Sequence, residues 1–129
     1  MRLIYVAGPL TPRGRESNGA LEYLQNISSM ITAAVTIMFD FGAAVIVPGL
    51  DFLLPILNPE ITEEMLKNNS LEQLRRCDAV FVLGVSPGVK AEIEAAESLG
   101  IPVIYDLSGL AAYFETEKAR EGKNEEALD

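Results

Sequence analysis

The sequence predicts a single α/β domain: a doubly wound parallel sheet of about four to five strands in the order 2-1-3-4, with helices on both faces. Apolar runs typical of buried strands alternate with helical segments along the chain. These runs lack alternating polar residues, as in parallel strands that are covered on both sides. Right-handed crossovers then lead to the order 2-1-3-4. A length of 129 residues suits one domain.

The elements follow from local signals. Thr62 and Ser86 are suitable N-caps, Pro87 suits a first helical position, and Gly100 is a C-terminal stop. Residues 48–62 contain three prolines and are expected to form a loop. We expect a domain over 1–121 and a charged, frayed tail over 122–129. The expected strands are 2–7, 43–47, 78–84 and 101–105, and the expected helices are 19–41, 63–76, 87–99 and 108–120.

Composition excludes several kinds of chemistry. The chain has no histidine and only one cysteine, Cys77, which we expect in the core. This leaves no histidine-dependent triad and no cysteine-zinc site, so we expect neither a metal nor a cofactor. A net charge of −9 argues against a nucleic-acid polymer as partner.

No membrane segment is expected. The apolar stretch over 27–57 is interrupted by two aspartates, a glycine and two prolines, so it is too broken to span a bilayer. The N-terminus does not read as a secretory signal. We therefore expect a cytoplasmic protein with no membrane partner.

The strand order also predicts where a ligand binds. Doubly wound sheets bind ligands outside the carboxyl ends of their strands, where the order reverses. Here that crevice lies between the first and third strands, and loops 8–15 and 84–92 border it.

Glu92 is the most informative residue at this crevice. A helical wheel places Lys90 and Glu94 on a polar face and Glu92 in the middle of the opposite face. A carboxylate there is costly unless it is paired or used. A structural glutamate bonded to loop amides is the alternative. The apolar residues that share its face are Val89, Ile93, Ala95, Ala96 and Leu99.

The flanking loops could hold an anion. Ser86 and Gly88 open the helix that carries Glu92, and a helix N-terminus offers free amides and a positive dipole. Gly8 lets the backbone approach a ligand, and Arg13 or Arg15 could clamp a phosphate. The alternatives are an ordinary helix start and solvated arginines.

With these residues identified, the chain resembles the nucleoside 2-deoxyribosyltransferase-like superfamily over residues 3–106. The resemblance rests on IYVAGP at 4–9, RRCDAVFVLG at 75–84 and SPGVKAEIEAAESLGIPVIY at 86–105. It implies that Glu92 is the nucleophile at the anomeric carbon of the sugar. It also implies that Tyr5, which could otherwise be only a core residue, hydrogen-bonds this nucleophile.

Within the superfamily, the motifs are most similar to the branch that hydrolyses 2′-deoxynucleoside 5′-monophosphates. Ser86, Gly88, Arg13 and Arg15 are similar to the phosphate contacts of that branch. The implied activity is cleavage or transfer at the N-glycosidic bond of a (deoxy)nucleoside 5′-monophosphate. Hydrolase and transferase both stay open, and the implied partner is a small-molecule nucleotide or nucleoside.

One position departs from the family pattern. Many members have an aspartate that helps to position and protonate the base, and the matching residue here is Ser70. A hydroxyl is a much poorer proton donor, so Asp51, Glu63 or Glu64 would have to replace it, possibly from a neighbouring subunit. The alternative function is a non-catalytic nucleotide-binding or sensor module on the same fold.

We also expect a homo-oligomer. The helix segment 27–41 is apolar nearly all round, and FLLPIL at 52–57 adds further apolar surface. Together they hold more hydrophobic surface than one small sheet can cover.

Overall fold

The structure is a computed structural model that describes residues 1–9 and 19–128, with side chains described except at 19, 20, 52 and 123–128. It contains a four-stranded parallel sheet in the order β2-β1-β3-β4, which confirms the predicted fold class and order. The strands are β1 (Leu3–Ala7), β2 (Ala44–Ile46), β3 (Ala79–Val82) and β4 (Val103–Ile104).

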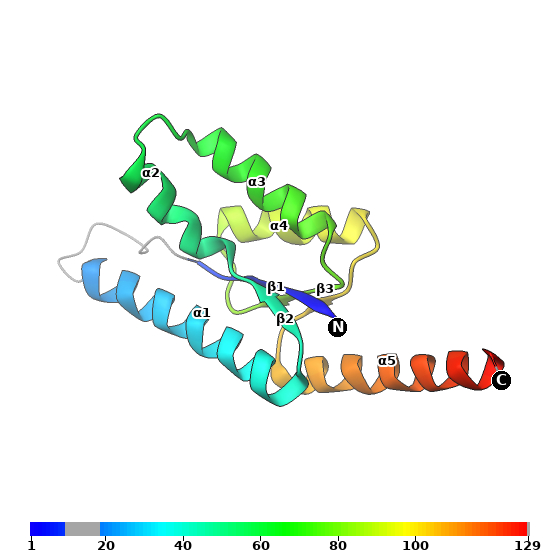
Figure 1. Ribbon diagram of the computed structural model, residues 1–129. Helices are drawn as coiled ribbons and strands as arrows, with labels where there is room; N and C mark the ends of the chain where they lie inside the picture. The colour runs from blue at the N-terminus through cyan, green and yellow to red at the C-terminus, as the bar shows by residue number, and fades with distance from the viewer. Residues whose placement is uncertain (10–18, 129) are drawn as a thin grey trace.

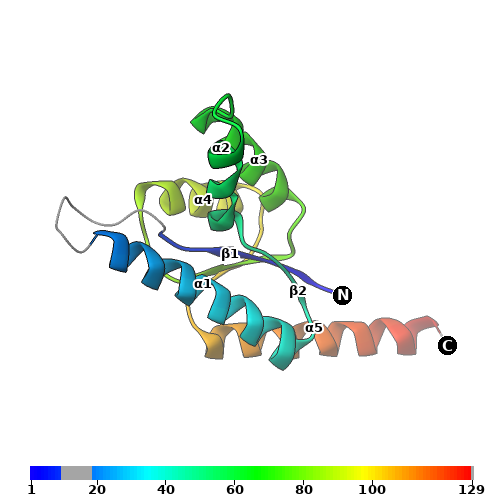
Figure 2. The same ribbon diagram turned by 60° about the vertical axis from the view of Figure 1, so that its left-hand side comes forward.

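Helices cover both faces of the sheet. In Figures 1 and 2, α1 and α5 lie along one face, and α3 and α4 lie along the other with α2 beside them. The helices are α1 (Gly19–Phe41), α2 (Leu53–Leu57), α3 (Glu63–Arg75), α4 (Pro87–Ser98) and α5 (Leu107–Leu128), and a 3₁₀ helix occupies Pro48–Phe52. The crossover between β1 and β2 passes through α1, and that between β3 and β4 passes through α4.

The predicted caps are confirmed. The Thr62 hydroxyl accepts a hydrogen bond from the Met65 amide at 3.1 Å, and the Ser86 hydroxyl accepts one from the Val89 amide at 3.2 Å. Gly100 has φ +73°, a left-handed conformation in which glycine is favoured. Leu99, expected to face the sheet, is half exposed because it lies at the very end of α4.

Two expectations about local structure were wrong. Residues 48–62 are not an open loop, because the 3₁₀ helix and α2 occupy most of that stretch. Helix α5 does not end at Arg120 but runs on to Leu128. The added residues include Lys, Glu, Ala and Leu, which all favour helix. The division of the chain into a domain over 1–121 and a tail over 122–129 stays a prediction.

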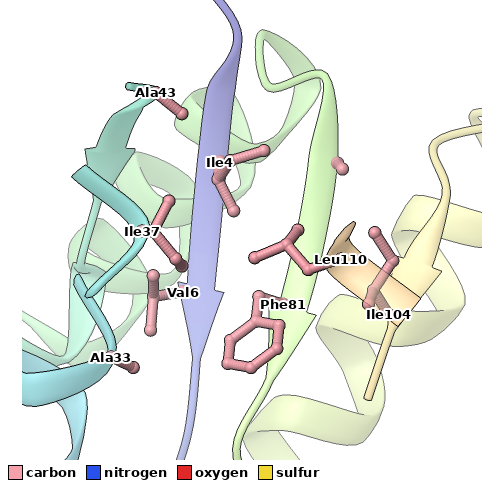
Figure 3. Packing of buried hydrophobic residues seen from close by; sticks show 9 residues of the cluster. Ile4, Val6, Ala33, Ile37, Ala43, Phe81, Ile104 and Leu110 are labelled. Atoms are coloured by element: carbon pink, nitrogen blue, oxygen red, sulfur yellow. The ribbon is translucent and has the colours of Figure 1, made fainter. Parts of the chain in front are cut away.

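The core consists of two layers, one on each face of the sheet. Along β1, Ile4 and Val6 point towards α1 and α5, whereas Tyr5 and Ala7 point towards α3 and α4. Figure 3 shows the first layer, in which Ala33, Ile37, Phe81, Ile104 and Leu110 pack around the strand residues. The second layer adds Leu74, Cys77, Val80, Val82, Val89 and Ala96. Cys77 is buried, as expected.

Across the described residues, no helix combines the length and the apolar character needed to cross a membrane.

Candidate functional site

A pocket with a volume of about 490 Å³ opens at the carboxyl ends of β1 and β2. Its floor includes Ala7 and Gly8, which end β1, and Pro48 and Gly49, which follow β2. Residues of α3 and of the first turns of α4 form its walls. The pocket lies on the α3–α4 face, and the two predicted loops reach it through Gly8 and through Pro87, Gly88 and Glu92. Its strand ends are those of β1 and β2, whereas the sequence predicts a crevice between β1 and β3.

Glu92 lines this pocket from the second turn of α4. The helix begins at the Ser86 cap and Pro87, and this start determines where its second turn meets the pocket. The carboxyl is partly buried. Burial raises the pKa of Glu92 to about 7, and the neighbouring Tyr5 hydroxyl partly offsets that effect. Near neutral pH the carboxyl is therefore poised between its charged and neutral forms.

Tyr5 lies in the middle of β1 and is fully buried. Its hydroxyl oxygen has no hydrogen-bond partner of good geometry among the described residues. Burial raises the pKa of Tyr5, as does the charge of Glu92, while the neighbouring Ser70 hydroxyl lowers it. Hydrogen bonds in catalytic sites are often completed only when a ligand binds. The fold thus brings Tyr5, Ser70 and Glu92 together.

Ser70 also lines the pocket, at the position where the family resemblance implies an acid. Its hydroxyl donates a hydrogen bond to the Lys67 carbonyl at 3.0 Å, one turn earlier in α3. Because the Ser70 hydroxyl donates its proton to this carbonyl within α3, it does not donate a hydrogen bond into the pocket.

The two predicted glycines border the pocket in different ways. A Cβ added to Gly8 would meet the side chains of Leu83 and Met30 at 3.4 Å, and neither side chain lines the pocket. A Cβ added to Gly88 would meet only the Ser86 hydroxyl, at 3.9 Å. Open space therefore adjoins Gly88, where a ligand could approach the backbone.

The structure describes the positions of only some of the predicted phosphate contacts. Ser86 caps α4 but is not among the residues that line the pocket. Arg13 and Arg15 lie outside the described residues. The pocket does contain a cation that the sequence analysis did not select, Lys67 of α3.

Two further carboxylates line the pocket, Asp51 of the 3₁₀ helix and Glu63 of α3. Asp51 accepts a hydrogen bond from the Asn69 side chain at 3.3 Å. Glu64, the third candidate acid, is not among the lining residues. The spacing of Glu63, Lys67 and Ser70 along α3 could have revealed their shared face, since residues three or four apart are neighbours on a helix.

Among the described residues, the side chains that line this cleft include three carboxylates and the cation of Lys67. In the part of the chain that the structure describes, no group of three or more Cys, Asp or Glu side chains is arranged to hold a metal ion.

Comparison with known proteins adds one structural likeness. No protein-family model matches the chain. No curated protein matches it either. Among solved structures, it is similar to a 2-deoxyribosyltransferase from the bacterium Bacillus psychrosaccharolyticus, with 24% sequence identity and a TM-score of 0.47. The match covers 78% of this chain and 69% of that one. A likeness at this level does not define a function, which has to be inferred from the pocket residues themselves.

Proposed function

We propose that this protein cleaves, or transfers at, the N-glycosidic bond of a (deoxy)nucleoside 5′-monophosphate, with Glu92 as the nucleophile and Tyr5 as the residue that orients it. The observation that carries the proposal is the partly buried carboxyl of Glu92 in a pocket that two more carboxylates also line. The proposal includes a cytoplasmic location, as expected from the sequence.

The reaction needs two roles from carboxyl groups. An oxygen of ionised Glu92 forms a bond to the anomeric carbon of the sugar as the bond from that carbon to the base breaks. The electron pair of the broken bond leaves with the base, which takes a proton from Asp51 or Glu63. Water or a second base then displaces Glu92 from the sugar and gives up a proton to the same Asp51 or Glu63, which regenerates the Glu92 carboxylate and the acid together. Carbohydrate hydrolysis by paired carboxylates follows the same logic.

Positive groups near the pocket suit a phosphate on the substrate. The first turn of α4 has the positive end of the helix dipole. Pro87 has no amide hydrogen, and the amides of Val89 and Lys90 are bonded to Ser86, so the Gly88 amide is the one that this turn can offer to a phosphate. Lys67 adds a cation from α3. Arg13 and Arg15 stay proposed contacts. A phosphate held here would position the sugar against Glu92, so that binding energy remote from the reacting atoms is used for orientation.

The first experiment measures free base released from a panel of nucleosides, nucleoside monophosphates and 2′-deoxynucleoside monophosphates. We expect release with wild type and a loss of roughly 10³-fold or more in Glu92→Gln, because an amide cannot serve as the nucleophile. Glu94→Gln is the matched control: it makes the same change in charge on an exposed face of the same helix. Full activity in Glu92→Gln would exclude the proposed mechanism.

A second experiment identifies the acid. Asp51→Asn and Glu63→Gln each remove one lining carboxylate, and Glu64→Gln removes a neighbour outside the pocket. We expect one of the first two variants to lose about 10²-fold or more in turnover, as is typical for a general acid. Full turnover in both would mean that neither carboxylate protonates the base.

The second candidate function is a non-catalytic nucleotide-binding or sensor module. The geometry of Ser70 favours it, since this hydroxyl is bonded within α3 and replaces the acid of the family pattern. In that case a nucleotide would raise the melting temperature of the protein, and no free base would appear even after long incubation.

A further inference from the structure

Met30 of α1 is buried, with 1% of its surface exposed, yet neither core layer of the sheet includes it. Its side chain lies instead against two glycines of the pocket floor, Gly8 and Gly49. Met30 itself does not line the pocket. Helix α1 lies on the opposite face of the sheet from α3 and α4, which form the pocket walls (Figure 2). Met30 therefore supports the floor from behind.

The contact between Met30 and Gly49 leaves no room for a side chain at position 49. A Cβ added to Gly49 would lie 2.7 Å from the Met30 Sδ and 2.8 Å from its Cε. Non-bonded heavy atoms pack at about 3.5–4.0 Å. The thioether end of a methionine is usually adaptable, but burial encloses this one. A methyl group at position 49 is therefore expected to push the backbone there away from α1.

The position of Gly49 determines that of Asp51. Both residues belong to the 3₁₀ helix Pro48–Phe52, which is so short that a shift at one of them moves the other. On the pocket side, the Asn69 side chain of α3 donates a hydrogen bond to the Asp51 carboxyl group at 3.3 Å. Asp51 is thus held from α1 through its backbone and from α3 through its side chain.

We propose that Met30 is a positioning residue, which acts through Gly49 to hold the 3₁₀ helix where Asp51 can protonate the leaving base. This inference rests on the proposed function, and it assigns the proton transfer to Asp51 of the two candidate acids. Asp51 is partly buried and held from two sides, whereas Glu63 is exposed in the first turn of α3. General acid catalysis requires the acid within hydrogen-bond reach of its target, which a held side chain satisfies.

Complementary changes at positions 30 and 49 test the proposal. Gly49→Ala adds the methyl group that would meet Met30, and Met30→Val removes the Sδ and Cε that it would meet. Each single variant should lower kcat by roughly 10- to 100-fold, since misplacing a catalytic group by about 1 Å can cost that much. KM should stay within about threefold, because the proposed phosphate contacts are unchanged. The double variant should regain kcat to within about threefold of wild type, because the space lost at one position is supplied at the other.

A merely structural role predicts a different order of activities. Without coupling between the two positions, the double variant would be less active than either single variant. Two control variants make the same side-chain changes away from the pocket and should keep the wild-type kcat. They are Met38→Val, at a half-exposed position of α1, and Gly122→Ala, where no atom lies within 4 Å of an added Cβ.

Hydrogen exchange adds a readout that does not depend on turnover. The Leu50 amide donates a hydrogen bond to the Val47 carbonyl at 3.1 Å within this turn. It should exchange roughly tenfold faster in Met30→Val and near the wild-type rate in the double variant. If wild type releases no base, the proposed function fails, and exchange alone decides whether Met30 holds the 3₁₀ helix.

Circular dichroism establishes that each variant is folded. If Gly49→Ala is not, Met30→Val and the double variant supply both readouts. Wild-type kcat in a folded single variant, a double variant no more active than the single ones, or unchanged exchange at Leu50 in Met30→Val would each overturn the proposal. Full turnover in Asp51→Asn would overturn it as well.

Discussion

Glu92 is an ionisable side chain in a partly buried position, and burial disfavours its charged form. Its carboxyl lies beside the apolar layer that contains Val89 and Ala96, and the pocket leaves it partly open to ligand. The resulting pKa of about 7 lies well above the ordinary value for glutamate. A carboxyl group whose charged form is disfavoured by burial lowers the stability of the fold near neutral pH, a cost that is common in active sites.

The first prediction concerns stability. Because its pKa is raised on folding, the native state binds the Glu92 proton more tightly than the unfolded state does. The contribution of this group to stability is therefore present in full below about pH 4.5 and is lost as pH rises through about 7. Glu92→Gln should raise the free energy of unfolding at pH 8 by at most about 3 kcal/mol.

Denaturant unfolding at pH 8 and pH 5 measures this effect. The gain from Glu92→Gln should be clearly smaller at pH 5, where the wild-type carboxyl is already protonated in the folded state. Glu94→Gln, on the exposed side of the same helix, should show no such dependence. An equal gain at both pH values would mean that burial does not raise the pKa of Glu92.

Tyr5 allows a second prediction, on the pH profile. Its hydroxyl favours the charged form of Glu92, so Tyr5→Phe should raise the pKa of Glu92 above about 7. If ionised Glu92 is the nucleophile, the acidic limb of kcat/KM then moves to higher pH. Stability should change by less than about 1 kcal/mol, because this hydroxyl has no good hydrogen bond to lose. An unmoved limb would leave Tyr5 as a core residue only.

At the level of single elements, α4 positions the catalytic candidate through its start. Ser86 and Pro87 begin the helix, and the polypeptide reaches Glu92 in the second turn. The same first turn carries the Gly88 amide that we propose as a phosphate contact. In the proposed mechanism, one short element therefore supplies both the nucleophile and a contact for the phosphate.

The third prediction separates capping from binding at Ser86. Ser86→Ala and Thr62→Ala each remove the hydroxyl that caps a helix, and each should lower stability by about 1 kcal/mol. Only Ser86→Ala should also reduce the preference for a nucleoside monophosphate over the nucleoside. Calorimetric titration with both ligands measures that preference. If it is the same in the two variants, Ser86 acts as a cap alone.

For the whole molecule, the two core layers have different roles. The layer between the sheet and α3 and α4 supports the pocket, whereas the layer with α1 and α5 supports the sheet from behind. Arg2 ties α5 to the sheet. It forms ion pairs with Asp78 at 3.6 Å and with Glu117 of α5. These ion pairs lie near the start of β1, away from the pocket.

The fourth prediction tests this division. Leu110→Ala opens a cavity under α5, where the leucine is fully buried, and should lower the free energy of unfolding by about 2–5 kcal/mol. Nucleotide affinity should stay within about twofold at temperatures where the variant is folded. Leu107→Ala, at a half-exposed position of the same helix, should cost less than about 1 kcal/mol. A large loss of affinity in folded Leu110→Ala would show that the two layers are coupled.

The sequence alone determined much of this protein. Unbroken apolar strands alternating with helices predicted the sheet and its order, because strands buried on both faces cannot contain regular polar residues. The caps at Thr62 and Ser86 and the stop at Gly100 were predictable because helix ends are satisfied by nearby residues. The placement of Glu92 among apolar residues also followed from helical periodicity.

Only the tertiary structure decided which side chains share the pocket with Glu92. Asp51, Glu63 and Lys67 come from two elements that are distant from α4 in sequence, and their meeting depends on how those elements pack. The bond from Ser70 to the Lys67 carbonyl likewise depends on a rotamer that no pattern reveals. Local patterns report the period of one element, whereas a site depends on the distances between elements, which long-range packing sets.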